Sequence, residues 1–297
     1  PHAMLVALAG GVGAARFLRG LVRVVPPAEV CVVVNTADDE TFHGLTVCPD
    51  LDTVTYTLSG LANRELGWGR HDETWSFMET MEALGGETWF RLGDRDVALH
   101  VERTNRLRKG ETLSAITADI ARRLGIKSKI VPMTDDRVRT RLLTDDGWLD
   151  FQEYFVHRKC EPVTKELAFD GASAATPHPD FMAALADPTL QAVVICPSNP
   201  FISVEPILAI PGVRDAMANC KAPVIAVSPI IAGRAVKGPT AKMMSELGLD
   251  PSAGVVARRY ADLLDGYVID HADMAEVVSI DARVTLAQTM MATIEDR

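Results

Sequence analysis

A short apolar run that leads through glycines into a helical pattern is the feature that most restricts the fold of this chain. Met4 to Ala9 is apolar and continues into Gly10-Gly11-Val12-Gly13, after which Ala14 to Leu21 has helical spacing. A strand, a glycine turn and a helix open the βαβ unit that binds nucleotides. The next apolar run, Val30 to Val34, follows at a distance that suits the crossover to a buried parallel strand.

The glycine turn predicts a phosphate-binding turn, with a tight strand-to-helix corner as the alternative interpretation. Glycine permits positive φ and close backbone approach, and the following helix N-terminus favours an anion. Arg16 stands where the dinucleotide fingerprint has its third glycine, and Asn35 stands where a ribose-binding acid is expected. A nicotinamide dinucleotide, and with it an oxidoreductase, is therefore disfavoured. Arg16 either pairs with phosphate or is a solvated residue of the first helical turn.

Two later apolar runs also end in small polar residues or glycine. Leu190 to Cys196 ends in Pro197-Ser198-Asn199, and Pro223 to Val227 ends in Ser228 and a turn at Gly233. The carboxyl ends of such strands line one crevice in a doubly wound sheet. We therefore predict an α/β, Rossmann-like fold with a doubly wound, mainly parallel sheet.

The segments between these strands complete the predicted organisation. Glycine turns and helical spacing over 53–125 predict a helical insertion that covers the crevice. Alternation on both sides of Asp145-Asp146-Gly147, up to Thr144 and from Trp148 to His157, predicts a β-hairpin. Strands are expected near 266–270 and 276–280, and a helix over 284–295. The chain is interpreted as one domain over 4–297, and residues 1–3 as the remnant of an expression tag.

Composition restricts the partners. The 297 residues include 30 Lys and Arg against 40 Asp and Glu, a net charge of −10 that disfavours nucleic-acid and anionic-membrane binding. The five cysteines form no Cys-x-x-Cys pair, so we expect small buried side chains rather than disulfides or zinc, and hence a cytoplasmic protein. No apolar run reaches transmembrane length, and no signal-peptide pattern is present.

Five acidic residues follow the second predicted strand. Asp38, Asp39, Glu40, Asp50 and Asp52 lie within eighteen residues that begin at Asn35. Carboxylates at the end of a buried strand suit a hard cation, and a cation suits phosphate. The alternative is that they are solvated loop acids, which is our interpretation of Asp39 and Glu40.

Seven motifs in order resemble the 2-phospho-L-lactate transferase, or CofD-like, family of coenzyme F-420 biosynthesis. They are GGVGAARFL, VVVNTADD, HGLTVCPDLDT, GWGRHDETW, WFRLGDRD, PSNPFISVEPIL and SPIIAG, and the resemblance runs from Leu5 to beyond Gly238. It implies a Rossmann-like homodimer with an inserted helical subdomain. It also implies transfer of a phosphorylated three-carbon acid (phospholactyl, phosphoenolpyruvyl or 3-phosphoglyceryl) from a guanosine diphosphate-activated donor to the deazaflavin Fo, with release of GMP.

The resemblance assigns roles to individual residues. Asp38 and Asp50 match the family's metal-binding aspartates and would hold Mg²⁺ at the catalytic centre, with Asp52 in a supporting position. The expected donor-nucleotide residues are Gly10, Gly11, Gly13, Asn35, Ser198, Asn199, Ser228 and Gly233. The expected Fo residues, on the acceptor side formed by 53–125, are Thr74, Trp89, Asp94, Arg95 and Asp96.

Several readings remain open from the sequence. Each polar residue after a strand can equally be a turn or cap residue. The histidines His71 and His100 are interpreted as structural, and either a carboxylate or the metal could take the acceptor proton. A non-catalytic nucleotide-sugar-binding regulatory protein of the same fold is the alternative function, but it would leave the motifs of the insertion without a purpose.

Overall fold

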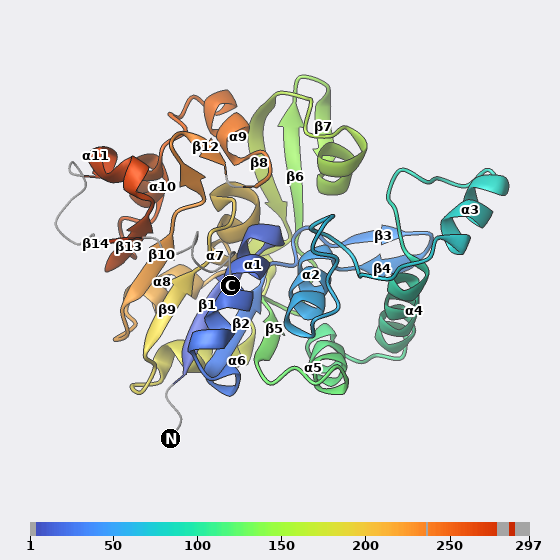
Figure 1. The fold of residues 1–297 in the computed structure, drawn as a ribbon, viewed down its shortest axis with the longest axis horizontal. Coiled ribbons are helices and arrows are strands. Elements are labelled where there is room, and N and C mark those ends of the chain that lie inside the picture. Colours follow the sequence, from blue (N-terminus) through green and yellow to red (C-terminus); the bar gives the residue numbers. More distant parts are fainter. Residues whose placement is uncertain (1–3, 236, 278–284, 289–297) are drawn as a thin grey trace.

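The fold is built on one sheet whose seven strands all run parallel, as seen in a computed structural model that describes residues 4–235, 237–277 and 285–288 (Figure 1). In spatial order the strands are β14 (Thr285–Gln288), β13 (Gly266–Ile269), β10 (Val224–Val227), β9 (Ala192–Ile195), β1 (Leu5–Ala9), β2 (Val30–Val34) and β5 (Lys129–Pro132). Sequence order therefore reverses between β1 and β9. This is the doubly wound arrangement that the sequence predicts.

The central strands are buried on both faces, and alternate residues face two different cores. Val6 and Leu8 of β1 point into a larger core, which includes Phe181 and Tyr267. Ala7 and Ala9 point to the opposite side. A side-chain period of two along a strand places successive residues on opposite faces, so a continuous apolar run is required here.

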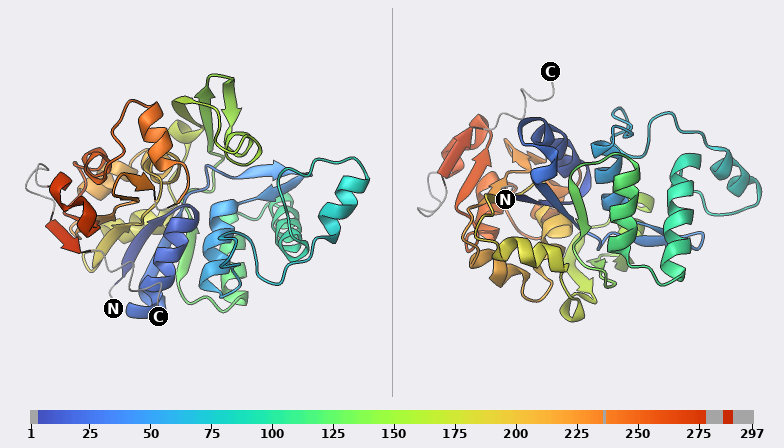
Figure 2. Two further views of the ribbon diagram at one scale, coloured as in Figure 1. Left: turned by 45° about the horizontal axis from the view of Figure 1, so that its top comes forward. Right: turned by 90° about the horizontal axis from the view of Figure 1, so that it is seen from below.

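Helices cover both faces (Figure 2). The smaller core lies under α1 (Gly11–Val24), α2 (Pro49–Leu58) and α5 (Leu113–Arg123). The larger core receives side chains from α6 (Pro179–Ala186), α7 (Glu205–Leu208), α8 (Val213–Ala218), α9 (Thr240–Glu246) and α10 (Ala253–Arg259). It also contacts a three-stranded antiparallel sheet of β7 (Gly147–Asp150), β6 (Arg139–Thr144) and β8 (Thr164–Asp170). The hairpin predicted around Asp145-Asp146-Gly147 is thus confirmed by the pairing of β6 with β7.

The segment between β2 and β5 projects from the sheet, at the right of Figure 1. It starts with a hairpin of β3 (Glu40–Phe42) and β4 (Leu45–Val47), which the sequence reading missed. Its turn residues His43 and Gly44 both have positive φ. The chain then forms α2, α3 (Ser76–Ala83), α4 (Asp94–Arg108) and α5, so it is mainly helical. Phe42 and Val47 pack with Met78 and Leu92 in a separate small core.

The strand predicted near 266–270 is confirmed as β13, but the two later predictions were wrong where the structure tests them. Residues 276 and 277, predicted as strand, belong to α11 (Met274–Val277). Residues 285–288, predicted as helix, form β14 and pair with β13. Pairing with the free edge of β13 outweighs the local pattern. The rest of both predictions, like the tag remnant at 1–3, lies outside the described residues.

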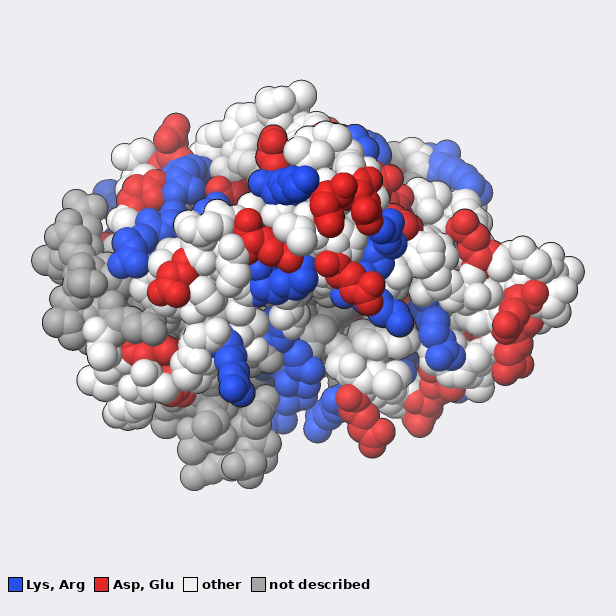
Figure 3. Space-filling view, turned by 90° about the horizontal axis from the view of Figure 1, so that it is seen from above, with Lys and Arg blue, Asp and Glu red and all other residues white. Residues whose placement is uncertain are grey.

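Charged side chains of both signs are interspersed on the face shown in Figure 3. No helix among the described residues is long and apolar enough to cross a membrane. Cys31, Cys48 and Cys196 are small buried side chains, as the sequence predicts, whereas Cys160 and Cys220 are only partly buried. A small hairpin of β11 (Ile230–Ile231) and β12 (Arg234–Ala235) follows β10.

Backbone contact at the reversal point requires glycine. A Cβ atom on Gly13 would lie 2.5 Å from the carbonyl oxygen of Pro197, directly after β9. A Cβ atom on Gly10 would lie 2.6 Å from Cβ of Ser203. Gly11 has a φ of +74°, in the left-handed region that side chains disfavour. Glycine at Gly10 and Gly13 therefore permits the close packing of α1 against the segment after β9.

Gly13→Ala is expected to lower the free energy of unfolding by about 1–3 kcal/mol, because the added methyl group meets a backbone carbonyl that cannot rotate away. Urea denaturation followed by circular dichroism would measure this change. Gly266→Ala is the control, because the added Cβ atom would lie 3.4 Å from its nearest neighbour, Cγ1 of Ile225, which is an ordinary van der Waals contact. Equal losses in the two variants would contradict this explanation of Gly13.

Candidate active site

A cavity of about 610 Å³ opens at the carboxyl ends of β1, β2 and β9, where the strand order reverses. Ligands of doubly wound sheets bind in such a crevice. The predicted site residues that line it are Gly10, Gly11, Gly13, Asp38, Asp50, Trp89, Ser198 and Asn199. Arg16 lines it too. Segments far apart in the sequence thus meet at one cavity.

Asp50 is held from two sides. It lies in the first turn of α2, and its Oδ1 accepts a hydrogen bond from the Gly11 backbone N–H at 2.9 Å. Its Oδ2 accepts a hydrogen bond from Asn35 Nδ2 at 3.0 Å. Asn35 is fully buried, and its own Oδ1 accepts the Ala37 N–H at 2.9 Å. Asn35 therefore orients Asp50 from behind and does not line the cavity.

Asp38 is a buried carboxyl group with one oxygen atom that lacks a hydrogen-bond partner among the described residues. It is 5% exposed, and this oxygen atom is Oδ1. Burial raises the pKa of Asp38 well above its usual value, and the nearby Asp50 carboxylate raises it further. Burial also raises the pKa of Asp50 to about 6, against the hydrogen bonds from Asn35 and Gly11.

The Asp38–Asp50 pair fits a hard divalent cation. Two buried carboxyl groups line this cavity, Asp50 disfavours the ionisation of Asp38, and Asp38 Oδ1 has no hydrogen-bond partner among the described residues. A buried charge normally has a partner, and a cation with oxygen ligands would be one here.

Ser198 and Asn199 also line the cavity, and both make local hydrogen bonds. Ser198 Oγ donates to the Gly10 carbonyl oxygen at 2.8 Å, which ties the end of β9 to the glycine turn. Asn199 Oδ1 accepts from the Phe201 N–H at 2.9 Å and so caps the π-helical turn Pro200–Val204. Each residue has a structural partner and still borders the cavity.

Six predicted binding residues lie outside the cavity lining besides Asn35. They are Ser228, Gly233, Thr74, Asp94, Arg95 and Asp96. Ser228 Oγ donates to the Ile230 carbonyl oxygen at 2.9 Å, and Gly233 has positive φ in the β11–β12 turn. Both positions thus have local backbone roles, which a pattern of polar residues after strands cannot distinguish from ligand contact.

Thr74, Asp94 and Arg95 belong to helix capping. Asp94 accepts hydrogen bonds from Thr74 Oγ1 at 2.6 Å and from the Phe77 N–H at 2.9 Å, at the start of α3. These hydrogen bonds, the one from Thr74 first, lower the pKa of Asp94. Glu73 in turn accepts the N–H groups of Arg95 and Asp96 in the first turn of α4, at 2.7 and 3.0 Å. A capping carboxylate at a helix start needs no ligand to explain it.

Asp52 of α2 and Asp96 of α4 belong to an ionic network between these two helices. Asp52 pairs with Arg103, and its Oδ2 lies 3.6 Å from Nδ1 of His100. Asp96 Oδ2 lies 3.0 Å from His100 Nε2 and its Oδ1 accepts from the Tyr56 hydroxyl. Asp52, Asp96 and His100 have the spacing of metal ligands, but Arg103 already supplies a cation. The structural interpretation of His100 fits its position, since its side chain is 1% exposed.

The interpretation of Asp39 as a solvated loop acid was wrong. Asp39 is 4% exposed, and burial raises its pKa to about 7, although Arg139 lowers it. Its Oδ1 lacks a partner among the described residues. Arg139 of β6, Cys48 before α2 and Arg103 of α4 lie near the Asp39 carboxyl group, and the sequence contains no local sign of these long-range neighbours.

The sequence analysis did not predict the aromatic wall of this cavity. Phe90, Phe151, Phe155 and Trp68 line the cavity together with Trp89. The Trp89 ring stacks on His157 with centroids 4.8 Å apart, and Phe151 stacks on Phe155 at 5.3 Å. Residues 151–157 were expected to continue a strand, but Glu153–His157 is a π-helical turn. The period-two pattern of β7 concealed this change of structure.

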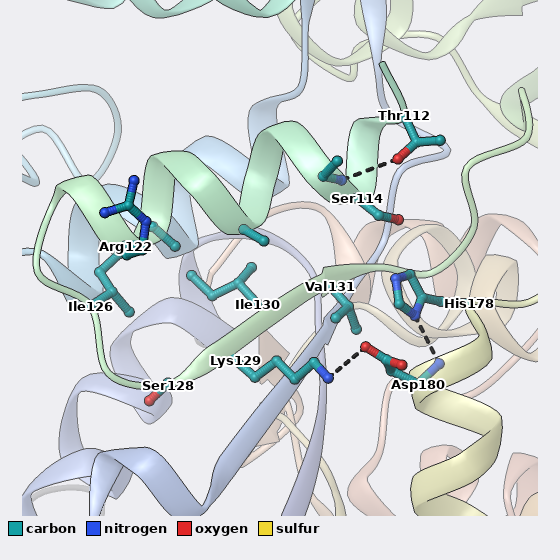
Figure 4. Close-up of a pocket in the computed structure, with 13 residues that line it drawn as sticks. Thr112, Ser114, Arg122, Ile126, Ser128, Lys129, Ile130, Val131, His178 and Asp180 are labelled. Atoms are coloured by element: carbon teal, nitrogen blue, oxygen red, sulfur yellow. Dashed lines mark hydrogen bonds and ion pairs between the residues drawn. The ribbon is translucent and has the colours of Figure 1, made fainter. Parts of the chain in front are cut away.

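A second cavity, of about 430 Å³, lies between α5, β5 and the start of α6 (Figure 4). None of the predicted site residues lines it. Its Lys129 is paired with Asp180 at 2.5 Å, and Nδ1 of its His178 accepts the Asp180 N–H at 3.0 Å. The cavity at the strand ends is therefore the candidate active site.

Comparisons with known proteins identify the family of this chain. A family model described as 2-phospho-L-lactate transferase CofD matches residues 5–296. A phosphoenolpyruvate transferase of Kitasatospora aureofaciens is 44% identical over 285 residues, which are 94% of this chain and 88% of that protein. The protein of that name in Streptomyces coelicolor is 41% identical over 298 residues, 98% of this chain and 93% of its own. The phosphoenolpyruvate transferase of Mycobacterium ulcerans is 38% identical over an alignment of 302 positions. That alignment covers 94% of this chain and 91% of the Mycobacterium ulcerans protein.

A crystal structure of a UPF0052 family member from Bacillus halodurans has a TM-score of 0.61 to this chain at 15% identity, and it covers 94% of this chain and 83% of that one. That likeness shows the α/β fold alone. The family and the relatives do not favour a non-catalytic regulatory protein. Because the family model spans nearly the whole chain, the chain belongs to the 2-phospho-L-lactate transferase CofD family, and it is an enzyme that transfers a phosphorylated acid in coenzyme F-420 biosynthesis.

Proposed function

We propose that this enzyme transfers a phosphoenolpyruvyl group from a guanosine diphosphate-activated donor to the ribityl hydroxyl of Fo and releases GMP. The observation that carries this proposal is the pairing of Asp38 and Asp50 beside the glycine turn, in one cavity at the reversal point of the sheet. Phosphoryl-group transfer needs its developing negative charge neutralised, and this cavity joins a phosphate-binding backbone to a cation site.

The identity of the transferred acid is a separate part of the proposal. The curated relatives at 38–44% identity are named phosphoenolpyruvate transferases, whereas the family model carries the name of 2-phospho-L-lactate. The two acids differ by two hydrogen atoms. We choose phosphoenolpyruvate because these relatives match this individual chain over most of its length.

The proposed metal is Mg²⁺, held by Asp38 and Asp50. When bound, it would neutralise phosphate oxygens and stabilise charge in the displacement. The protein prepares the site beforehand. Asn35 and the Gly11 amide each hold one oxygen of Asp50, so that its carboxylate cannot rotate away from Asp38. The glycine turn at Gly10–Gly13 and the wall at Ser198 and Asn199 are proposed to bind the donor diphosphate and nucleotide.

The bond changes are balanced. The acceptor oxygen forms a bond to the phosphorus that bears the acid, and the bond from that phosphorus to GMP breaks. The hydroxyl proton is lost, GMP leaves with the bonding electrons, and a phosphodiester remains. Orientation of both substrates in one cavity supplies much of the acceleration, because it replaces a bimolecular encounter.

The acceptor side is proposed to be the aromatic wall. Trp89 and Phe90 come from the helical insertion over 53–125, and Phe151 and Phe155 come from beyond β7. A flat tricycle suits such a surface. The predicted residues Thr74, Asp94, Arg95 and Asp96 would act only by positioning this insertion. The rest of 4–297 is proposed to form a single domain with it.

We also propose that the enzyme is a homodimer, because the family resemblance implies one. We propose a cytoplasmic location because the buried free cysteines suit a reducing compartment. Light scattering after size-exclusion chromatography would give the mass in solution. A monomer at micromolar concentration would exclude the dimer.

Asp50→Asn is expected to keep the fold but lower turnover about 1,000-fold, since an amide replaces one of the two carboxylates of the metal site. Product formation at several Mg²⁺ concentrations would measure the loss, and circular dichroism would verify folding. Mg²⁺ should raise the melting temperature of the wild type and not of the variant. Glu40→Gln, a partly exposed acid outside the cavity lining, is the control. Near-normal activity of Asp50→Asn would exclude the metal assignment.

The donor acid can be determined from the product mass. Incubation with Fo, Mg²⁺ and the phosphoenolpyruvate-activated guanosine diphosphate should convert Fo to a product that lacks two hydrogen atoms relative to the phospholactyl product. The phospholactate- and 3-phosphoglycerate-activated donors should react at least about 10-fold more slowly. Preference for either of those donors would overturn the choice of acid, and failure of all three would overturn the proposed function.

A further inference from the structure

Arg91 presents an uncommitted guanidinium group at the cavity. It lines the cavity, and its Cζ atom lies 4.3 Å from the ring centroid of Trp75. Within the described part of the chain, its side chain makes no hydrogen bond or ion pair. Stacking on an aromatic face leaves the edge of the guanidinium, with its N–H donors, free for a ligand.

The neighbours of Arg91 hold it in place. Phe90 stacks on Phe42 with centroids 4.1 Å apart and planes 15° apart, and Leu92 is fully buried. Phe42 belongs to β3, four residues after Asp38. The loop that carries Arg91 is therefore packed on the hairpin that directly follows one carboxylate of the proposed metal site.

Of the residues that the structure describes, three with cationic side chains line this cavity: Arg16, Arg91 and Lys237. Arg16 lies on α1, three residues after Gly13. Lys237 lies near Gly67 and Val12, since a Cβ on Gly67 would be 4.0 Å from Lys237 Nζ and 3.7 Å from Val12 Cγ1. Both cations are thus placed on the side of the glycine turn, where phosphate is expected. Arg91 is the cation presented by the insertion.

A phosphorylated acid brings a carboxylate into this cavity in addition to its phosphates. That carboxylate meets an acidic pair, Asp38 and Asp50, and needs a counter-charge of its own. A planar guanidinium fork binds a carboxylate through two parallel hydrogen bonds, which an ammonium group cannot reproduce. Building on the proposed function, we infer that Arg91 binds the carboxylate of the transferred acid and makes the enzyme selective for acid donors.

Arg91→Gln tests this inference when two donors are compared, the phosphoenolpyruvate-activated nucleotide and the same nucleotide with its carboxylate replaced by a carboxamide. The variant should lower kcat/KM for the acid donor about 100-fold, because a charge-assisted pair loses one partner. For the carboxamide donor the change should stay within about 3-fold, as should the change in KM for Fo, since neither uses the fork. Arg91→Lys should recover only part of the loss, because it restores the charge and not the fork.

Two controls separate the possible failures. Arg123→Gln removes a guanidinium that is 68% exposed on α5, outside this cavity, and should leave both donors unaffected. Wild-type turnover of the acid donor tests the proposed function by itself. With that turnover present, equal losses of Arg91→Gln on both donors, or a rise in KM for Fo alone, would overturn the assignment of Arg91 to the carboxylate.

Discussion

The hydrogen bonds of Asp50 join the parts of the molecule that the active site depends on. Its carboxylate, in the first turn of α2, accepts the Gly11 N–H at the start of α1 and the Asn35 amide at the end of β2. Two connections that leave the sheet, the one after β1 and the one after β2, are thereby held at one point. Gly10 and Gly13 permit this arrangement, since a side chain on either would collide with the segment after β9. The crevice of the doubly wound sheet is consequently narrow and acidic at its base, with the glycine backbone on one side.

The buried carboxylates near this point are of two kinds. Asp52 has a cationic partner in Arg103, so its burial is compensated within the protein. Asp38 and Asp50 lie close together with no cationic side chain paired to them among the described residues, and Asp38 Oδ1 makes no hydrogen bond there. Burial raises the pKa of all three carboxyl groups. Burying charge without compensation costs several kcal/mol, which a purely structural site would avoid. The contrast between the two pairs supports a ligand role for Asp38 and Asp50 and a structural role for Asp52.

The cavity combines two chemically different walls. One consists of backbone and short polar side chains at the ends of β1 and β9, which suits phosphates and a nucleotide. The other is aromatic and is assembled from the insertion and from the π-helical turn after β7, whose His157 stacks on Trp89. Arg91 lies next to Phe90 on this second wall. A donor on the polar wall and a flat acceptor on the aromatic wall would meet at Asp38 and Asp50.

The parallel sheet, the glycine turn and the hairpin around Gly147 could be predicted from sequence, because each rests on a local period or on the φ requirement of a turn. Motif resemblance also selected Asp38, Asp50 and Trp89, which the fold brings to one cavity. The roles of Asp39, Asp94 and Arg91 could not be predicted, since a loop acid, a helix cap and a ligand residue look alike in sequence. Burial of Asp39 beside Arg139, capping by Asp94 and the stacking of Arg91 on Trp75 are long-range contacts. Local pattern thus determined the strands and the turn, whereas tertiary packing decided which polar side chains face the ligand, because only packing determines which of them lose water to a protein partner.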